Sequence, residues 1–198
     1  ICEDSGAGTV IIHRDLIAAL RPVLDGRQVI AVTPGPALCA AYGISPAAAA
    51  DAPDCAEWAD LVDAAEPLSE KAMTRPLMRY TSGSTGRPKG VRRASTGARR
   101  DFEPVLRQVG DEMMRLSAGD RFFTAAPIYH SAPSTLTAAA LVTPGVCVHV
   151  APKFDPEAFL ERIARDRITH VYMVPTMMSR LLKLPEAVKA RHDLSSVR

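Results

Sequence analysis

Cysteine is scarce in this chain of 198 residues, and its four cysteines are widely scattered. They form no C-x-x-C pair, which argues against both a zinc site and a disulfide framework. We therefore expect reduced and mostly buried thiols, as in a cytosolic protein. The residues concerned are Cys2, Cys39, Cys55 and Cys147.

Long apolar runs are also missing. No stretch approaches the roughly 18–20 uninterrupted apolar residues that a membrane span requires. The chain begins without a basic segment followed by an apolar one, so no secretory signal is expected. Together these absences predict a cytoplasmic protein without a membrane span. The 47% share of hydrophobic residues is ordinary for a globular domain.

Net charge is small, at +2, and it excludes little by itself. Six basic residues nevertheless crowd one segment, and they are either a solvated helix entry or a local positive field that attracts phosphate groups. No recognition motif or aromatic platform accompanies them, so we expect no nucleic-acid partner. These residues are Arg87, Lys89, Arg92, Arg93, Arg99 and Arg100.

Short β-branched runs alternate with stretches of helical period along the chain. The runs predict strands at 9–13, 28–32, 76–80, 121–125, 146–150 and 169–174. The periodic stretches predict helices at 16–24, 57–65, 98–116, after 133, from 156 and at 175–184, with a surface loop at 33–53. This alternation predicts an α/β fold with mostly parallel sheets flanked by helices.

One loop, residues 81–90, holds three glycines, four hydroxyl side chains and a lysine in ten positions. Glycine lets backbone N–H groups approach a polyanion closely, and a lysine places a positive charge beside phosphate oxygens. A flexible surface loop has similar composition, so composition alone leaves both interpretations open. The Walker pattern does not fit, because Lys89 comes three residues after Gly86 and is followed by Gly90.

Residues 80–91, Tyr-Thr-Ser-Gly-Ser-Thr-Gly-Arg-Pro-Lys-Gly-Val, instead resemble the loop of the adenylate-forming, or AMP-binding, enzymes throughout. The segment Ala-Pro-Ile-Tyr-His-Ser-Ala-Pro at 126–133 resembles that family's next motif, an aromatic–histidine pair. Weaker likeness extends over nearly the whole chain. The segments Pro-Ile-Tyr-His-Ser-Ala-Pro at 127–133 and Met-Ser-Arg-Leu-Leu-Lys-Leu-Pro at 178–185 most resemble bacterial fatty-acyl and bile-acid-type acyl-CoA synthetases. The resemblance identifies the chain as part of the family's large N-terminal domain.

The resemblance implies two half-reactions. A carboxylate attacks the α-phosphorus of ATP to give an acyl-adenylate and pyrophosphate, and the thiol of coenzyme A then displaces AMP. Neither half-reaction needs a protein nucleophile, so positioning and charge neutralisation are the protein's task. The loop would hold the β- and γ-phosphates through Thr81, Ser82, Gly83, Ser84, Thr85, Gly86 and Lys89, and the hydroxyls of Thr81 and Thr85 would help to orient Mg²⁺.

By the same resemblance, Tyr129 and His130 would line the carboxylate and thiol-entry region, with His130 as the catalytic candidate. A histidine at a strand end can equally cap local backbone groups. Val174 and Pro175 fall where the family's acyl pocket has its wall, although strand-to-helix packing explains them nearly as well. No acidic residue lies at 127–133 to meet an amino group, and small apolar residues follow at 138–140. We therefore expect a fatty acid or another bulky hydrophobic carboxylic acid as substrate.

The ends of the sequence suggest an excerpt. The chain has no initiator methionine, and 193–198 looks like the approach to another strand. The family's later motifs and its C-terminal lid are not found in these residues, so we expect the chain to be inactive alone. Two other classes stay open at this point: a stand-alone nucleotide-binding module, and a structural or interaction fragment with a vestigial loop.

Overall fold

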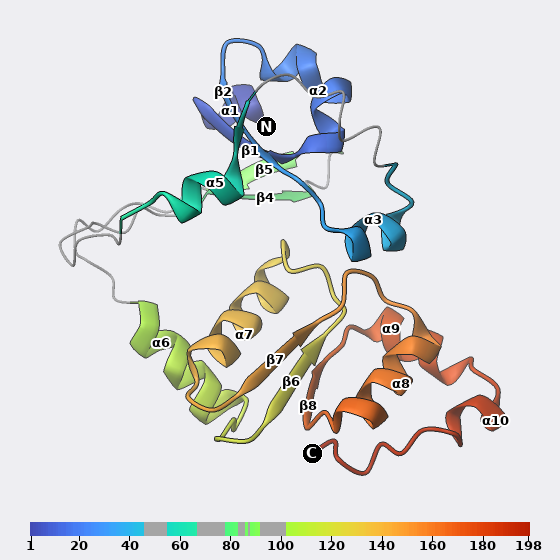
Figure 1. Ribbon diagram of the computed structural model, residues 1–198. Helices are drawn as coiled ribbons and strands as arrows, with labels where there is room; N and C mark the ends of the chain where they lie inside the picture. Colours follow the sequence, from blue (N-terminus) through green and yellow to red (C-terminus); the bar gives the residue numbers. More distant parts are fainter. Residues whose placement is uncertain (46–54, 67–77, 83–85, 87, 92–101) are drawn as a thin grey trace. The chain divides into compact units, whose positions relative to one another are not determined.

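The computed structural model describes residues 1–45, 55–66, 78–82, 86, 88–91 and 102–198. The chain divides into two units, Ile1–Arg100 and Asp101–Arg198. Their strands and helices carry the labels of Figure 1.

Unit 1 is built on three parallel strands in the order β1-β2-β3. Ile17 and Leu24 of one helix bury their side chains against Ala31 of the central strand, which gives this unit a small apolar core. The strands are β1 (Thr9–His13), β2 (Gln28–Val32) and β3 (Ala56–Glu57). The helical elements are α1 (Cys2–Ser5), the 3-10 turn η1 (Arg14–Leu16), α2 (Ile17–Leu24), α3 (Pro36–Tyr42) and α5 (Trp58–Asp63).

An ionic network joins the carboxyl ends of these three strands. Glu57 at the end of β3 accepts a hydrogen bond from Arg14 at 2.7 Å and another from the Thr33 backbone N–H at 2.7 Å. The hydrogen bond from Arg14 outweighs partial burial and holds the pKa of Glu57 below its usual value. A charged contact thus supplements the thin core of unit 1.

A two-stranded antiparallel hairpin completes the described part of unit 1. It pairs β4 (Arg79–Ser82) with β5 (Pro88–Val91). The residues of β5 are exposed, except for Gly90, which is half-buried. Strand β5 therefore presents its side chains to solvent instead of burying them in a core.

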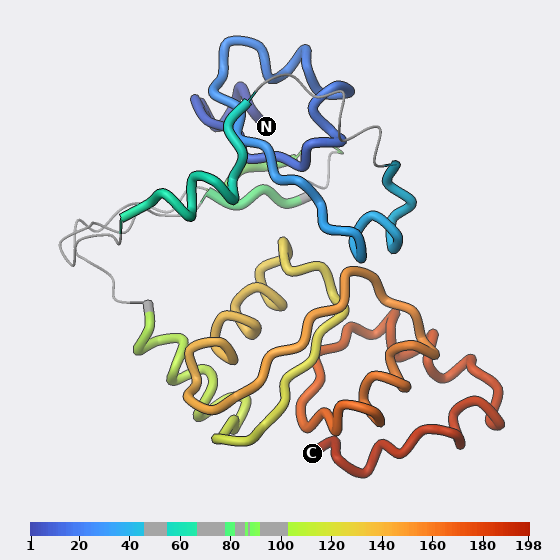
Figure 2. The backbone as a smooth tube through the Cα atoms, viewed as in Figure 1, coloured from blue at the N-terminus to red at the C-terminus, as the bar shows by residue number. Residues whose placement is uncertain are grey.

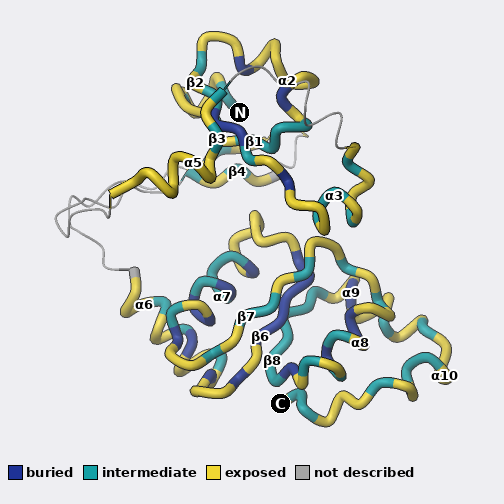
Figure 3. The backbone as a smooth tube through the Cα atoms, viewed as in Figure 1, coloured by how far each residue is buried: buried dark blue, intermediate teal, exposed yellow. Residues whose placement is uncertain are grey.

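Unit 2 has a second parallel sheet, ordered β7-β6-β8. Its central strand is buried on both faces, as Figure 3 shows by the dark blue along β6. The strands are β6 (Arg121–Thr124), β7 (Cys147–Val150) and β8 (His170–Tyr172). The helices are α6 (Phe102–Gln108), the π-helical turn η2 (Val109–Met113), α7 (Ser131–Val142), α8 (Pro156–Asp166), α9 (Pro175–Leu182) and α10 (Glu186–Lys189).

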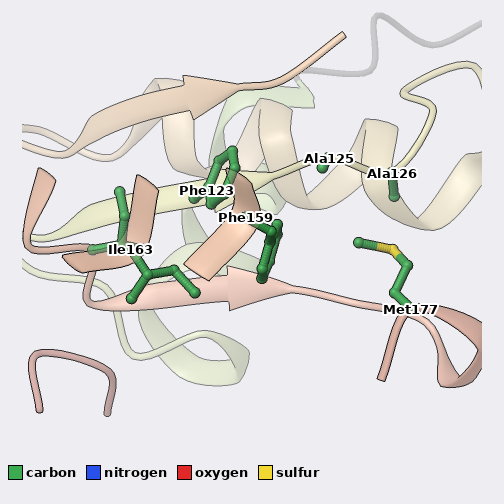
Figure 4. Close-up of a cluster of buried hydrophobic side chains, with 7 residues drawn as sticks. Phe123, Ala125, Ala126, Phe159, Ile163 and Met177 are labelled. Atoms are coloured by element: carbon green, nitrogen blue, oxygen red, sulfur yellow. The ribbon is translucent and has the colours of Figure 1, made fainter. Parts of the chain in front are cut away.

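Helices cover both faces of this sheet because neighbouring side chains of a strand point in opposite directions. Phe122 packs with Leu116 and with Ala140 of α7 on one face. Phe123 packs on the other face with Phe159 of α8 and Met177 of α9. Figure 4 shows this second cluster, in which the Phe123 and Phe159 rings stack with centroids 4.8 Å apart. Unit 2 is thus a three-layer α/β arrangement with a parallel sheet inside.

Most of the predicted elements are confirmed. The strands at 9–13 and 28–32 have the predicted bounds, and the helix that opens at Pro156 is capped by Asp155, whose carboxylate accepts from the Ala158 N–H at 3.0 Å. The α/β class with parallel sheets flanked by helices is also confirmed.

Three details differ from the predictions. The surface loop predicted at 33–53 contains α3, which Pro36 begins and Gly43 ends in a left-handed conformation. The loop predicted at 81–90 contains strand β5, which the Gly and Pro content concealed. The regular helix predicted at 98–116 changes to π geometry at Val109–Met113. There Gly110 lies so close to Thr143 that a Cβ atom would collide with it.

The cysteine prediction needs a correction as well. All four thiols are free, but none is buried: three are half-buried and Cys147 is exposed. No helix in the described ranges is long and apolar enough to cross a membrane.

Candidate functional site

The predicted phosphate loop lies at the turn of the β4–β5 hairpin. Ser82 and Pro88 are its last paired residues. Gly86 adopts a φ of 79°, in the left-handed region that side chains disfavour, so glycine suits this position. The predicted residues Gly83, Ser84 and Thr85 lie outside the described residues.

Thr81 and Lys89 are direct cross-strand partners in this hairpin. Directly opposed residues of an antiparallel pair place their side chains on the same face. Both residues are exposed. The hairpin therefore presents a hydroxyl group and an ammonium group side by side next to a glycine-containing turn. Such a set of donors can bind phosphate oxygens.

Tyr80 and Gly90 fix the hairpin one pair further from the turn. They are partners in register, and a Cβ on Gly90 would come within 3.0 Å of the Tyr80 ring. The Tyr80 hydroxyl donates to the Asp4 carboxylate at 2.5 Å, and this hydrogen bond raises the pKa of the phenol. Tyr80 thus ties the hairpin to α1 within unit 1.

The described residues supply little of a magnesium site. Mg²⁺ takes oxygen ligands, commonly one or two carboxylates together with substrate phosphates and water. On the hairpin, the described residues offer the Thr81 hydroxyl but no carboxylate. No group of three or more His, Cys, Asp or Glu side chains in the described part could hold a metal ion. Any Mg²⁺ here would depend chiefly on the phosphates that it accompanies.

Tyr129 and His130 follow β6 at the carboxyl end of the parallel sheet of unit 2. Figure 2 lets the reader follow the chain from β6 through this segment into α7. Tyr129 is 83% exposed, and its ring lies 4.6 Å from the His130 ring. His130 is the N-cap residue of α7, but its side chain makes no capping hydrogen bond. The local structure therefore gives no capping role to the imidazole.

Val174 and Pro175 lie at the same edge, because β8 is parallel to β6 and paired with it. Val174 is half-buried against the cluster around Phe159, whereas Pro175 is exposed at the first turn of α9. Ligands of open α/β sheets bind outside the carboxyl ends of the strands. The fold therefore brings the four predicted substrate-side residues of unit 2 to one edge, with Val174 also serving the core.

A cavity of about 250 Å³ lies between this sheet and α8. The stacked rings of Phe123 and Phe159 contribute apolar surface, and Lys153, Arg162 and Arg165 contribute positive charge. Asp155 and Glu161 also line the cavity, so its lining combines apolar surface with charges of both signs. The sequence did not predict this cavity. Its only sequence signal is a pair of arginines, Arg162 and Arg165, three positions apart on α8.

The small residues at 138–140 serve packing in the structure. Ala139 and Ala140 are completely buried, and Ala140 packs against Phe122 and Leu116. Their small size is explained by the close approach of α7 to its neighbours. Of the predicted basic cluster, only Lys89 lies within the described residues.

Comparison with known proteins gives a family. The model of the family described as "AMP-binding enzyme" matches residues 1–198. Among curated relatives, a feruloyl-CoA synthase of Amycolatopsis is 34% identical over 62% of this chain and 23% of its own length. An acetyl-coenzyme A synthetase of Nitrosomonas europaea is 32% identical over 71% of this chain and 22% of its own length. The chain thus spans less than a quarter of either relative.

Solved structures share the fold. The ATP-bound structure of MatB from Rhodopseudomonas palustris matches with a TM-score of 0.65 and 22% identity, over 100% of this chain and 35% of that protein. The amide bond synthetase McbA from Marinactinospora thermotolerans matches with a TM-score of 0.61 and 24% identity, again over 100% and 35%.

Proposed function

Because the chain belongs to the AMP-binding enzyme family, we propose that it contributes the phosphate-holding part of an ATP-dependent carboxylate-activating enzyme. The parent reaction is that of an acid–thiol ligase: acid and ATP give an acyl-adenylate and pyrophosphate, and CoA then takes the acyl group. The names of the relatives support this class, since they are CoA synthases, synthetases and ligases.

The cross-strand pairing of Thr81 with Lys89 carries the proposal. A hydroxyl and an ammonium group on one exposed face, beside a glycine turn, form a set of donors that suits phosphate oxygens. Lys89 holds the β- and γ-phosphates of ATP, together with Ser82, Gly83, Ser84, Thr85 and Gly86. Neutralising these phosphates makes pyrophosphate a better leaving group. Thr81 and Thr85 help to orient the Mg²⁺ that accompanies ATP.

The carboxyl edge of the unit 2 sheet is proposed to bind the carboxylic acid. His130 orients the carboxylate and Tyr129 lines the approach of the acid and of CoA. Two observations support this assignment: both rings are exposed, and the imidazole is not engaged in capping α7. Val174 and Pro175 form part of the acyl wall.

The identity of the acid is the finer part of the proposal. We propose a fatty acid or a bulky hydrophobic acid, because no acidic residue in 127–133 is available for an amino group. The names of the relatives include a feruloyl and an acetyl group, so the panel of test acids includes aromatic and short acids. A cytoplasmic location, inferred from the sequence, stays a prediction.

The selectivity of the chain among ATP, pyrophosphate and AMP tests whether it binds the β- and γ-phosphates as proposed. The chain is titrated with ATP, pyrophosphate and AMP in the presence of Mg²⁺ by calorimetry. We expect ATP and pyrophosphate to bind and AMP to bind at least tenfold more weakly, because AMP lacks the two phosphates that the hairpin holds. Equal affinity for AMP would instead indicate a general nucleotide-binding module, and no binding of any of the three would indicate a structural fragment.

Turnover is tested separately. Since the chain covers less than a quarter of the two relatives above, we propose that it does not catalyse acid-dependent exchange of pyrophosphate into ATP by itself. The exchange assay is run on this chain with the panel of acids. Clear exchange would show that the residues described here suffice for adenylation and would overturn this part of the proposal.

A further inference from the structure

The two faces of the β4–β5 hairpin carry different groups. Neighbouring side chains of a strand point in opposite directions, so Tyr80 lies on the face opposite to Thr81. Thr81 and its cross-strand partner Lys89 occupy one face, which we call the donor face. Tyr80 and its partner Gly90 occupy the other, which we call the back face. A contact on the back face can therefore hold the hairpin without covering the donors on the donor face.

A hydrogen bond joins the back face to α1. The Tyr80 hydroxyl donates to a carboxylate oxygen of Asp4 at 2.5 Å, across 76 positions of the chain. A hydrogen bond to a carboxylate is shorter and stronger than one between neutral groups. This contact is the main reason why the pKa of Tyr80 is raised. The Tyr80 ring in turn lies over Gly90, where a Cβ atom would be 3.0 Å from the ring carbon Cζ.

Asp4 lies on a segment that is itself fixed to the sheet of unit 1. Three residues later, the Ala7 carbonyl accepts from Nη1 of Arg27 at 2.5 Å. The Gly8 carbonyl accepts at 2.9 Å from the N–H of Gln28, the first residue of β2. The Asp4 carboxylate therefore has a defined position relative to the parallel strands, and Tyr80 takes its position from it.

Electrostatics alone predicts a different role for this carboxylate. A negative charge near a phosphate-binding element repels the ligand, so its removal should strengthen the binding of ATP or leave it unchanged. If Asp4 instead holds the hairpin, its removal should weaken ATP binding. The direction of the change therefore distinguishes the two roles.

We propose that Asp4 is a positioning residue for the phosphate-binding hairpin. Through Tyr80 it holds the back face on α1, so that Thr81 and Lys89 reach the phosphates of ATP from one fixed place. A hairpin held in this way needs less ordering when the ligand binds. The inference rests on the proposed function, because it concerns the residues that hold the β- and γ-phosphates there.

The affinities of Asp4 variants for ATP and for pyrophosphate test the inference. The 198-residue chain is titrated with each ligand in the presence of Mg²⁺ by calorimetry. We expect Asp4→Ala to weaken both by about threefold to tenfold, the range that corresponds to one such hydrogen bond. Asp4→Asn keeps one acceptor oxygen and should lose less. The matched control Glu3→Gln removes the same charge from an exposed position of α1 and should weaken neither ligand.

A double-mutant cycle shows whether Asp4 acts through Tyr80. Tyr80→Phe keeps the ring over Gly90 and removes the hydroxyl, so it should weaken ATP binding as much as Asp4→Ala does. The double variant should lose no more than either single variant. Absorbance titration of the phenols gives an independent signature, with Tyr80→Phe identifying the phenol concerned. Asp4→Ala should lower the pKa of Tyr80 towards its ordinary value, whereas Glu3→Gln should leave it raised.

Circular dichroism checks that each variant is folded; if Asp4→Ala is not, Tyr80→Phe tests the same contact from the other partner. Unchanged or tighter ATP binding by the folded variants would overturn the inference, and so would additive losses in the cycle. Failure of the proposed function is distinguishable, because the unchanged chain would then bind neither ATP nor pyrophosphate, or Lys89→Ala would bind them equally well. Either of these results would overturn both the function and the role of Asp4.

Discussion

Strand β6 in unit 2 and strand β5 in the hairpin of unit 1 are both four residues long but are used in opposite ways. β6 is paired on both edges and covered by helices on both faces, and three of its four residues are buried. Among the strands that the structure describes, β5 pairs with β4 alone, and it leaves Lys89 and Thr81 beside it exposed. Stability is therefore concentrated in β6, whereas β5 presents side chains that a ligand can reach. Mutations should separate these two uses.

Phe123→Ala should have the largest effect on stability. The ring is fully buried and stacks on Phe159, so its removal leaves a cavity in the core of unit 2. We expect a loss of about 3–5 kcal/mol in the free energy of unfolding. Urea unfolding followed by circular dichroism measures it, because the single tryptophan, Trp58, lies in unit 1. Tyr129→Ala is the control and should cost less than about 0.5 kcal/mol; similar losses for the two variants would break the comparison.

Asp120→Asn should have an intermediate effect. Asp120 is 2% exposed just before β6, accepts from the N–H and hydroxyl of Ser117 at 2.9 and 3.0 Å, and lies 3.1 Å from Arg198. Replacing the charged acceptor should cost about 1–3 kcal/mol. Urea unfolding at neutral pH gives the value, and a loss within error of zero would remove Asp120 from the stabilising contacts of β6.

The same carboxylate predicts how stability depends on pH. Burial alone raises the pKa of Asp120, but the hydrogen bonds from Ser117 and Thr169 and the charge of His170 outweigh it, so the folded pKa lies below the ordinary 3.8. A lowered folded pKa adds stability above the unfolded value and loses it as the pH falls through the folded value. The wild-type chain should therefore lose more stability than Asp120→Asn when unfolding is compared between neutral pH and a pH below 3.8. Parallel pH profiles of the two proteins would contradict this.

His130→Ala should have the smallest effect on stability. The residue is exposed and its side chain does not cap α7, so we expect a change below about 0.5 kcal/mol. A loss above about 1 kcal/mol would favour a structural role for the ring over the proposed one on the acid. Thermal unfolding by circular dichroism, with Ser131→Ala at the first helical position as the control, distinguishes the two.

The sequence predicted the scaffold better than the exposed edge. Phe122 and Phe123 stand next to each other in the sequence because β6 is buried on both faces, and Pro156 after Asp155 begins a helix for reasons local to those residues. Strand β5 was missed because glycine and proline are rare inside strands, and its pairing with β4 depends on a partner that propensity does not reveal. The cavity beside α8 was missed because residues of different elements line it.

The candidate site shows the same division. The loop motif indicated Thr81 and Lys89 by their order in the sequence, but only the register places them opposite each other. Likewise, Tyr129 and Val174 are far apart along the chain and reach one edge because β6 and β8 are paired in parallel. The resemblance to a family assigned roles to individual residues. Only the fold shows which of these residues lie next to one another.

The affinity of the chain for ATP with and without the Lys89 ammonium group tests the central claim most directly. Lys89→Ala and the matched loss of charge Lys183→Ala, on an exposed residue that ends α9, are compared with the unchanged chain by calorimetry in the presence of Mg²⁺. A charge-assisted contact with phosphate contributes about 1.5–3 kcal/mol, so Lys89→Ala should weaken ATP binding by roughly tenfold or more while Lys183→Ala leaves it unchanged. Equal ATP affinity of all three proteins would contradict the assignment of this hairpin as the phosphate-binding element.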